Sequence, residues 1–578
     1  MKDNGSLDPI MPKENYIDLN NLFGNYFAKA MDSVGSFYFT KEVFDGTYPG
    51  YGSSYPDLQG GLGLLFEQAS SRGHVQETAF GKLTFPFTIR NQYISSIAAL
   101  EAAVANKAYL RKYQQDFFKS ALTNAAKTRI KGYTFKEDYD QNRMKAFIDK
   151  LLLHKVAVYR TNEGYTVPTR QPQYRMVQTF FETYDKYRDS VYYDASAWSV
   201  ANFYNIKYKS VSTLNLGEKV TTTEGMATPK PVIASNYAYI IDYDDYNAPA
   251  VLYYLQDHNI KVSTAFKPFE IQTESGKQAF NYGALVVPVP LQKTGSQKVF
   301  EVIQKAQQLY QVPIYAVKTG YSTRGIDLGS RNIRPLTKPK AAMLIGDGVS
   351  SYEAGEVWHL LDARVQMPIT KIPLRNLERV NLDRYNVFVL VSGRYQLSDK
   401  QQRRLQDWVK KGNTLVTIGR ASEWLLKQEL VEEQLIEKEK DTSNVERKPY
   451  VDARENIGKD RVGGIILKVD LDITHPLAFG YHDTQIPIYK NNTVWLKPSK
   501  NTYATVAKYA KKAHVDGFIT KENTETFLKH AASLVVSPLG SGRVVLFADN
   551  PNFRGSWYGT NRLFLNALFL GNHVNVPE

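Results

Sequence analysis

The sequence predicts an α/β protein in which a partial α/β domain is followed by doubly wound α/β units with β-rich insertions. From about residue 232, apolar runs of strand length alternate with segments of helical periodicity. This alternation repeats from residue 341 onward. The N-terminal part differs, because one apolar run of strand length, residues 62–66, precedes a long helical pattern over residues 93–127.

These patterns divide the chain into four regions. Residues 1–127 form the partial domain, and residues 128–228, with short alternating runs rich in Tyr and Thr, form a β-rich connecting region. Residues 229–335 form the first α/β unit, and residues 336–578 form a second unit with a charged and β-rich insertion at about 428–537. The expected strands of the two units are 238–242, 261–266, 284–289, 313–317, 341–345, 385–391 and 414–418. The expected helices are 248–257, 299–309, 351–361, 399–410 and 420–427.

The composition excludes several functional classes. The 578 residues are 43% hydrophobic and carry a formal net charge of +14, but Lys and Arg are dispersed, so we expect no nucleic-acid partner. The absence of cysteine excludes disulfides, thiolate metal sites and a cysteine nucleophile. No run of about 18 apolar residues occurs, so we expect no membrane span.

The first candidate site follows a loop rich in Gly, Ser and Tyr that begins at Tyr48. The loop leads into the apolar run 62–66, which ends on Glu67. We expect this run to form a buried strand that presents Glu67 at its end, a common position for a general base. Arg72 follows closely and is the candidate substrate-binding residue.

Residues 10–105 resemble the C-terminal half of the carboxypeptidase A-like zinc carboxypeptidases, in particular a long bacterial branch with a large C-terminal extension. The resemblance is carried by residues 26–35, 38–42, 48–73 and 83–92. It implies that Glu67 is the catalytic carboxylate, which acts on a zinc-bound water. Members of the family have a mobile tyrosine upstream of the catalytic glutamate. The resemblance implies that Tyr48 is this tyrosine, with Tyr51 and Tyr55 as competing positions. Peptides would be the substrates, and complete members contain zinc and are exported.

The chain departs from this family where the zinc ligands belong. In the family a His-x-x-Glu pair and a third histidine precede the catalytic glutamate, but here no histidine precedes Glu67 and no arginine precedes Arg72. We therefore expect a half-domain that is inactive alone and holds no zinc. A complementing N-terminal half or a homo-oligomer contact would cover its exposed surface. The resemblance suggests an exported protein, but residues 1–6 lack the apolar core of a signal peptide. The sequence therefore does not predict the localisation.

One further segment has the spacing of metal ligands. His74 and Glu77 would share a face if they lay on a helix. The spacing of the chain suggests no third ligand among His154, His258 and the later histidines. We interpret the segment as a polar loop and assign no metal ligand.

After residue 232, the order of strands and helices resembles the class I glutamine amidotransferase-like fold. In that fold a strand–turn–helix elbow presents a cysteine, but the corresponding residues 417–422 contain none. Ser422 is a candidate substitute nucleophile, although serine caps helices far more often and no matching histidine follows it. The alternative function is therefore a non-catalytic module that binds a ligand or a protein.

Three polar clusters also lie near expected strand ends. Residues 346–356 open a helix where an anion could bind, although Ser350 and Glu353 fit a capping box that needs no ligand. Asp549, Asn550 and Arg554 could bind a ligand or form a local turn. Asp242, Asp244 and Asp245 could serve a carboxylate-pair hydrolase, but no further acid is paired with them in the sequence, and an acidic turn explains them. His475, His482, His514 and His530 have no ligand-like spacing and are expected at the surface or in the core.

Overall fold

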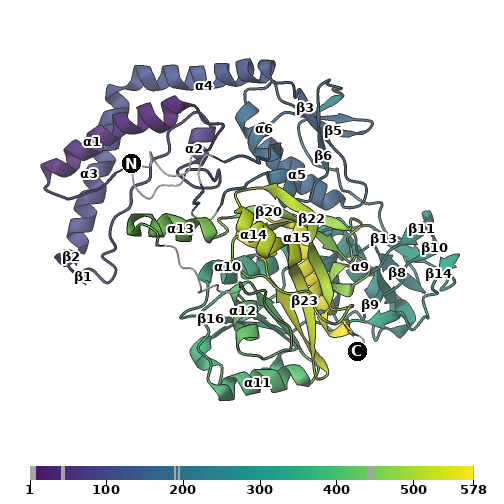
Figure 1. Cartoon of the computed structure of the whole chain (residues 1–578). Coiled ribbons are helices and arrows are strands. Elements are labelled where there is room, and N and C mark those ends of the chain that lie inside the picture. The colour runs from purple at the N-terminus through teal and green to yellow at the C-terminus, as the bar shows by residue number, and fades with distance from the viewer. Residues whose placement is uncertain (1–7, 41–45, 188–189, 193–194, 439–446, 577–578) are drawn as a thin grey trace. The chain divides into compact units, whose positions relative to one another are not determined.

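A computed structural model describes residues 8–40, 46–187, 190–192, 195–438 and 447–576 (Figure 1). Residues 1–6, residues 41–42 of the 38–42 run, and residues 439–446 of the predicted insertion lie outside the described residues. The chain divides into two compact units. Unit 1 is Met1–Thr134, Leu151–Ser199 and Tyr208–Val220, and unit 2 is Phe135–Lys150, Val200–Lys207 and Thr221–Glu578. The four-region division stays a prediction.

Helices dominate the first part of unit 1. The elements are η1 (Glu14–Leu19), α1 (Asn20–Ser33), α2 (Tyr55–Leu58), β1 (Val75–Thr78), β2 (Gly81–Thr84), α3 (Phe85–Ala105) and α4 (Lys107–Lys127). Strands β1 and β2 form a hairpin, and α1 lies alongside α3 (Figure 1). The helical pattern predicted over residues 93–127 is therefore two helices that meet at Asn106, and the first of them begins at Phe85.

A small sheet completes unit 1, as the β-rich pattern after residue 128 predicts. Its strand order is β6 (Tyr208–Val211), β3 (Gly132–Phe135), β5 (Gly164–Pro168), β4 (Val158–Thr161) and β7 (Glu218–Val220). Helix α6 (Tyr174–Phe181) packs on it, with the Phe181 ring stacked at 4.7 Å on Tyr133 of β3. Aromatic stacking of this kind fits the high tyrosine content of the segment.

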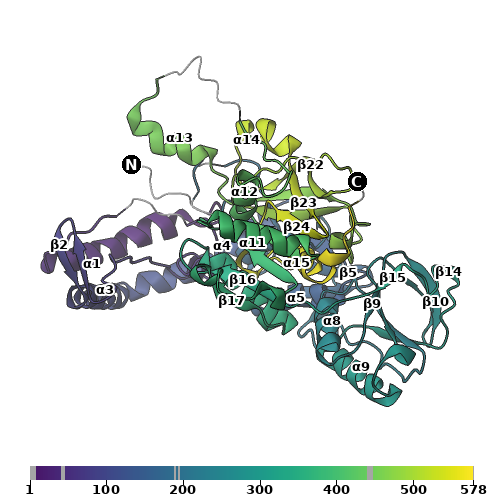
Figure 2. The same cartoon turned by 90° about the horizontal axis from the view of Figure 1, so that it is seen from below.

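The first sheet of unit 2 is antiparallel throughout. Its order is β13 (Ile314–Val317), β8 (Ala238–Ile241), β12 (Leu285–Pro288), β9 (Ser263–Ala265) and β15 (Ile333–Pro335), with helices α8 (Ala248–Asp257) and α9 (Ser296–Tyr310). A second, small sheet contains β11 (Gly276–Phe280), β10 (Phe269–Thr273) and β14 (Arg324–Gly325) (Figures 1 and 2). In the chain, the β10–β11 hairpin connects β9 to β12, and β12 runs antiparallel to β9. The region is α/β as predicted, but its strands are not wound in parallel.

The third sheet of unit 2 has nine strands among the described residues. Five are parallel: β17 (Thr370–Pro373), β16 (Ala341–Ile345), β18 (Val387–Leu390), β19 (Thr414–Ile418) and β24 (Gly542–Phe547). Four antiparallel strands extend it beyond β24: β23 (Ala532–Leu539), β22 (Thr505–Asp516), β20 (Ile465–Leu471) and β21 (Gln485–Lys490). The helices of this part are α10 (Ser351–His359), α11 (Asp399–Lys410), α12 (Arg420–Lys427), α13 (Ala453–Asp460), α14 (Lys521–Thr526) and α15 (Tyr558–Leu570).

Helices cover both faces of the parallel strands. Successive strand residues point to opposite faces, so Val389 belongs to the core that includes α10 and α15, whereas Phe388 belongs to the core that includes α11 and α12. Both side chains are fully buried. This part of the chain is therefore a doubly wound α/β sheet. In the described residues no helix is both long and apolar enough to cross a bilayer.

Candidate functional site

Glu67 does not lie at the end of a buried strand. Residues 62–70 are irregular, and Leu65 and Phe66 keep 55% and 39% of their surface exposed. The segment is held by Gly63, whose N–H donates to Asp57 Oδ1 at 2.8 Å, and by Phe66, whose ring packs edge-on against Phe27 at 4.6 Å. The predicted buried strand is wrong, because the apolar segment has no strand partner among the described residues.

The other predicted peptidase residues lie in ordinary surroundings. The Tyr48 side chain is buried, and its ring packs edge-on against Tyr51 at 5.2 Å. Arg72 is exposed in the turn that follows the irregular segment 62–70, and its backbone N–H donates to Ser70 Oγ at 3.3 Å. The roles of Glu67, Tyr48 and Arg72 stay predictions.

His74 and Glu77 do not share a helix face. His74 has φ +75° and precedes β1, while Glu77 lies within β1 and pairs with Lys82 across the hairpin at 3.7 Å. The His74 ring lies 5.3 Å from the ring of Phe85. Among the residues that the structure describes, no three His, Asp or Glu side chains are grouped so that they could hold a metal ion.

The elbow predicted at residues 417–422 is present, but its reactive position is a glycine. Gly419 lies between β19 and α12 with φ +55° and ψ −119°, a backbone that glycine adopts freely and that is strained in a residue with a side chain, as in the nucleophile of such a turn. A Cβ on Gly419 would lie 2.6 Å from Ser392 Oγ. Ser422 is fully buried, hydrogen-bonded to Thr417 Oγ1 at 2.8 Å and to the Phe547 carbonyl at 2.9 Å. Ser422 is therefore a structural anchor and not a nucleophile.

Glutamates from α10 fill the carboxyl edge of the parallel strands. Ser350 caps α10 by accepting the Glu353 N–H at 3.2 Å, but Glu353 accepts the Ser392 N–H at 2.8 Å and does not complete a capping box. Glu356 accepts the Arg554 N–H and the Asn550 side-chain amide, both at 2.6 Å. Burial raises the pKa of Glu356 to about 7.

Asp549, which sequence reasoning grouped with Asn550 and Arg554, belongs to a separate buried cluster. Its carboxylate pairs with Lys490 at 3.1 Å and accepts hydrogen bonds from Tyr509 at 2.8 Å and Ser533 at 2.6 Å. Lys490 is fully buried, and its ammonium lies 4.1 Å from the centre of the Trp495 ring. Every partner belongs to the sheet or its connecting loops, so this cluster has a structural role.

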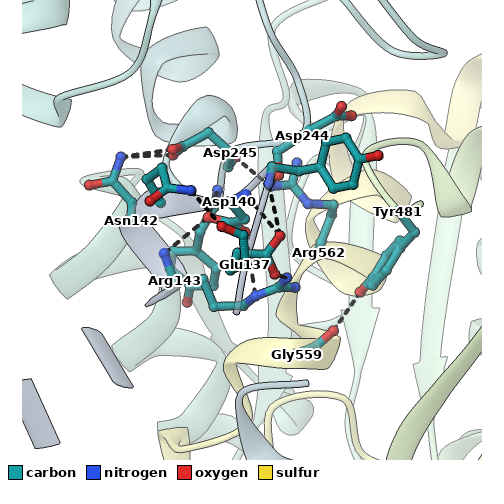
Figure 3. A network of polar contacts seen from close by, with 12 residues as sticks. Glu137, Asp140, Asn142, Arg143, Asp244, Asp245, Tyr481, Gly559 and Arg562 are labelled. Carbon is teal, nitrogen blue, oxygen red and sulfur yellow. Dashed lines mark hydrogen bonds and ion pairs between the residues drawn. The ribbon is translucent and has the colours of Figure 1, made fainter. Parts of the chain in front are cut away.

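A second polar network lies beyond the end of β8, where residues 137–143 meet the acidic turn 242–246 and Arg562 of α15 (Figure 3). Asn142 donates to both oxygens of Asp245 at 3.0 and 2.9 Å. Asp140 accepts the backbone N–H groups of Arg143 at 3.0 Å and Tyr246 at 2.9 Å. The acidic turn 242–245 therefore has an acid partner, because the charge of Asp140 acts on Asp245. The sequence did not suggest this pairing, because the two residues are about a hundred positions apart.

This network borders a cavity of about 100 Å³. His482 hydrogen-bonds to Asp244 Oδ2, and the Tyr139 ring stacks on the imidazole with ring centres 3.5 Å apart. Lys207 and Asp483 form an ion pair on the same wall. His482 is therefore neither a free surface residue nor a core residue, but part of an oriented Asp–His pair at a small polar cavity.

Burial and like charges shift the acids of this network. Burial and the neighbouring Asp244 raise the pKa of Asp242 to about 7, and burial and Asp140 raise the pKa of Asp245 to about 8. Burial opposes the charged form of His482, but its hydrogen bond with Asp244 prevails and raises its pKa. The site can hold protons near neutral pH, yet the described residues that line the cavity include no serine, threonine or cysteine.

Comparisons with known proteins give weak similarities. No family model and no curated protein sequence matches the chain. Solved structures similar to part of it include a ThuA-like protein from Parabacteroides merdae, with 12% identity over 42% of this chain and 92% of that chain and a TM-score of 0.28. They also include a GMP synthase subunit from Thermoplasma acidophilum, with 10% identity over 40% of this chain and 94% of that chain and a TM-score of 0.24. A β-galactosidase from Bacillus circulans matches with 14% identity over 49% of this chain and 36% of that chain, and with a TM-score of 0.23.

TM-scores of this size carry no argument about this chain. The doubly wound α/β fold of residues 341–578 is shown by its own geometry, and its likeness to the amidotransferases stays a prediction. That geometry consists of five parallel strands with helices on both faces and of the strand–turn–helix elbow at Gly419.

Proposed function

We propose that this chain is a zinc metallocarboxypeptidase-like protein that supplies the Glu67 segment but not the zinc ligands, and that it has no peptidase activity alone. The observation that carries the proposal is a conflict between sequence and structure in residues 62–67. Their pattern favours a buried strand, yet Leu65, Phe66 and Glu67 are exposed. An apolar strand segment without a sheet is what a domain presents when the rest of its sheet belongs to another polypeptide segment.

In the complete site, zinc would supply a water of lowered pKa. Glu67 would accept a proton from that water and pass it to the amine that leaves the C-terminal peptide bond. The Tyr48 loop would close over the substrate, and the guanidinium of Arg72 would bind a carboxylate of the substrate. These roles follow from the resemblance, and the exposed position of Glu67 leaves the carboxylate accessible to such a partner.

The test has two arms. The chain alone, with added zinc, should release no C-terminal residue from peptide substrates, and turnover that Glu67→Gln abolishes would contradict inactivity. Fusion of the zinc-ligand half of a carboxypeptidase from the same bacterial branch ahead of residue 8 should give turnover that depends on Glu67. An active fusion that is indifferent to Glu67→Gln would overturn the assigned role.

We propose a second function for unit 2, a non-catalytic module that binds a ligand or a protein. Gly419 at the elbow favours it, because the position carries no nucleophilic side chain and Ser392 Oγ fills the adjacent space. Ammonia release from glutamine should stay at the buffer rate in the presence of the chain. Release above that rate would contradict the proposal.

A further inference from the structure

Helix α3 in unit 1 has its polar and apolar faces reversed. Its buried positions are Asn91, Ser95, Ala98 and Ala102. Asn91 donates to Ser36 Oγ at 2.8 Å and to Gln68 Oε1 at 3.2 Å. The inward face of the helix is thus small and polar, unlike that of an ordinary helix on a core.

The opposite face is an apolar stripe exposed to solvent. Its members are Phe85, Ile89, Tyr93, Ile97, Leu100 and Val104, between 37% and 77% exposed. At 100° per residue they occupy an arc of about 120° centred opposite Asn91. Their exposed area is roughly 600 Å², close to the ~800 Å² that each partner contributes to a standard interface.

The stripe is nearly symmetric about residue 95. Phe85 and Val104, Ile89 and Leu100, and Tyr93 and Ile97 lie at almost equal distances from that position. When two copies of a helix pack antiparallel about a twofold axis at its middle, each apolar residue meets its counterpart. The spacing therefore fits a second copy of the same helix.

The charges on α3 have the same symmetry. Arg90 and Glu101 are its only charged residues, and both are exposed, although the Arg90 guanidinium also donates to Asn91 Oδ1 at 3.2 and 3.1 Å. They lie on the same flank of the stripe and are symmetric about residue 95.5. In an antiparallel pair the same flanks face each other, so Arg90 would meet Glu101 of the partner subunit, and the contact would form twice.

We propose that two copies of this chain associate through the outward faces of α3, packed antiparallel. The inference is independent of the proposed peptidase role, because the Glu67 segment contacts the opposite side of the helix through Gln68 and Asn91. The partner is a second copy of the chain because, in an antiparallel pair of α3 helices, each apolar residue and each charge of one helix meets its counterpart on the other.

The test is sedimentation velocity of the full chain between about 1 and 100 µM. We expect a species of twice the 65.7 kDa chain mass, at least tenfold weaker dimerisation in Leu100→Glu, and no change in Leu309→Glu, which alters an exposed leucine on α9. Arg90→Glu and Glu101→Arg should each weaken the dimer several-fold, and the double variant should restore it. Circular dichroism checks that the exposed substitutions leave the fold intact.

Three outcomes would overturn the proposal. The first is a monomer at about 100 µM, which would assign the stripe to a different polypeptide such as the complementing half. The second is a dimer that persists in Leu100→Glu, which would place the contact elsewhere. The third is a double charge variant no better than either single variant, which would exclude the antiparallel pairing.

Discussion

Strand β18 in unit 2 and helix α3 in unit 1 both have strongly apolar sequences, yet their surroundings differ. Every residue of β18 is buried, because helices cover both faces of its sheet. In α3 six large apolar residues face solvent and two, Phe87 and Ile94, are half-buried, while the fully buried side chains are small or polar. The comparison teaches that an apolar pattern predicts a buried face but does not say whether the same chain provides the cover.

The largest expected effect comes from the buried ion pair of unit 2. Lys490 donates to Asp549 Oδ1, to Asn492 Oδ1 at 3.2 Å and to the Val494 carbonyl at 2.7 Å. Lys490→Met would leave the Asp549 carboxylate buried without its cation, so we expect a loss of about 3–5 kcal/mol in the free energy of unfolding. Urea unfolding measures the loss. Lys490→Met with Asp549→Asn should recover part of it, and a single variant that loses under ~1 kcal/mol would show that the pair is not sealed from water.

The elbow gives the next effect. Gly419→Ala adds a Cβ at 2.6 Å from Ser392 Oγ to a backbone with positive φ, so we expect a loss of about 2–4 kcal/mol. Gly412→Ala is the matched control, because Gly412 also has positive φ but its Cβ would meet nothing nearer than 4.0 Å. Equal losses in the two variants, measured by urea unfolding, would mean that Ser392 does not restrict the elbow.

The acid network predicts a pH dependence. Asp245 keeps its proton in the folded state up to a pKa of about 8, whereas the unfolded carboxyl loses it near 3.8. The folded state therefore binds more protons between these values, and its stability falls as pH rises, by at most about 1.4 kcal/mol per pH unit. Asp245→Asn cannot ionise and keeps an acceptor for Asn142. We expect its stability relative to the original chain to rise by about 1–3 kcal/mol from pH 5 to pH 8, and a constant difference would contradict the shifted pKa.

The sequence predicts the local elements of unit 2 well and its pairings poorly. The run 385–391 contains β18 and the run 414–418 matches β19, because short apolar runs between turn residues have few alternatives. The antiparallel order around β8 escaped prediction, because strand and helix alternation does not record direction. Asp140 and His482 were also missed as partners of the acidic turn, since residues a hundred or more positions apart carry no local signal of contact. In residues 62–66 the pattern favours a strand, but no neighbouring strand among the described residues is available to it.

The smallest expected effect tests the reversal of α3 directly. Asn91→Ala removes a buried amide that bonds Ser36 and Gln68, so we expect a loss of about 1–2 kcal/mol. Leu100→Gln should change the stability by less than about 0.5 kcal/mol, because the side chain is 63% exposed. On an ordinary helix the leucine would be the costlier loss, at about 2–5 kcal/mol for truncation to alanine. Both variants are compared by urea unfolding of dilute protein in a Glu101→Arg background, which weakens the proposed dimer. A costly Leu100→Gln in that background would mean that the chain covers its own stripe, and the contrast between β18 and α3 would then disappear.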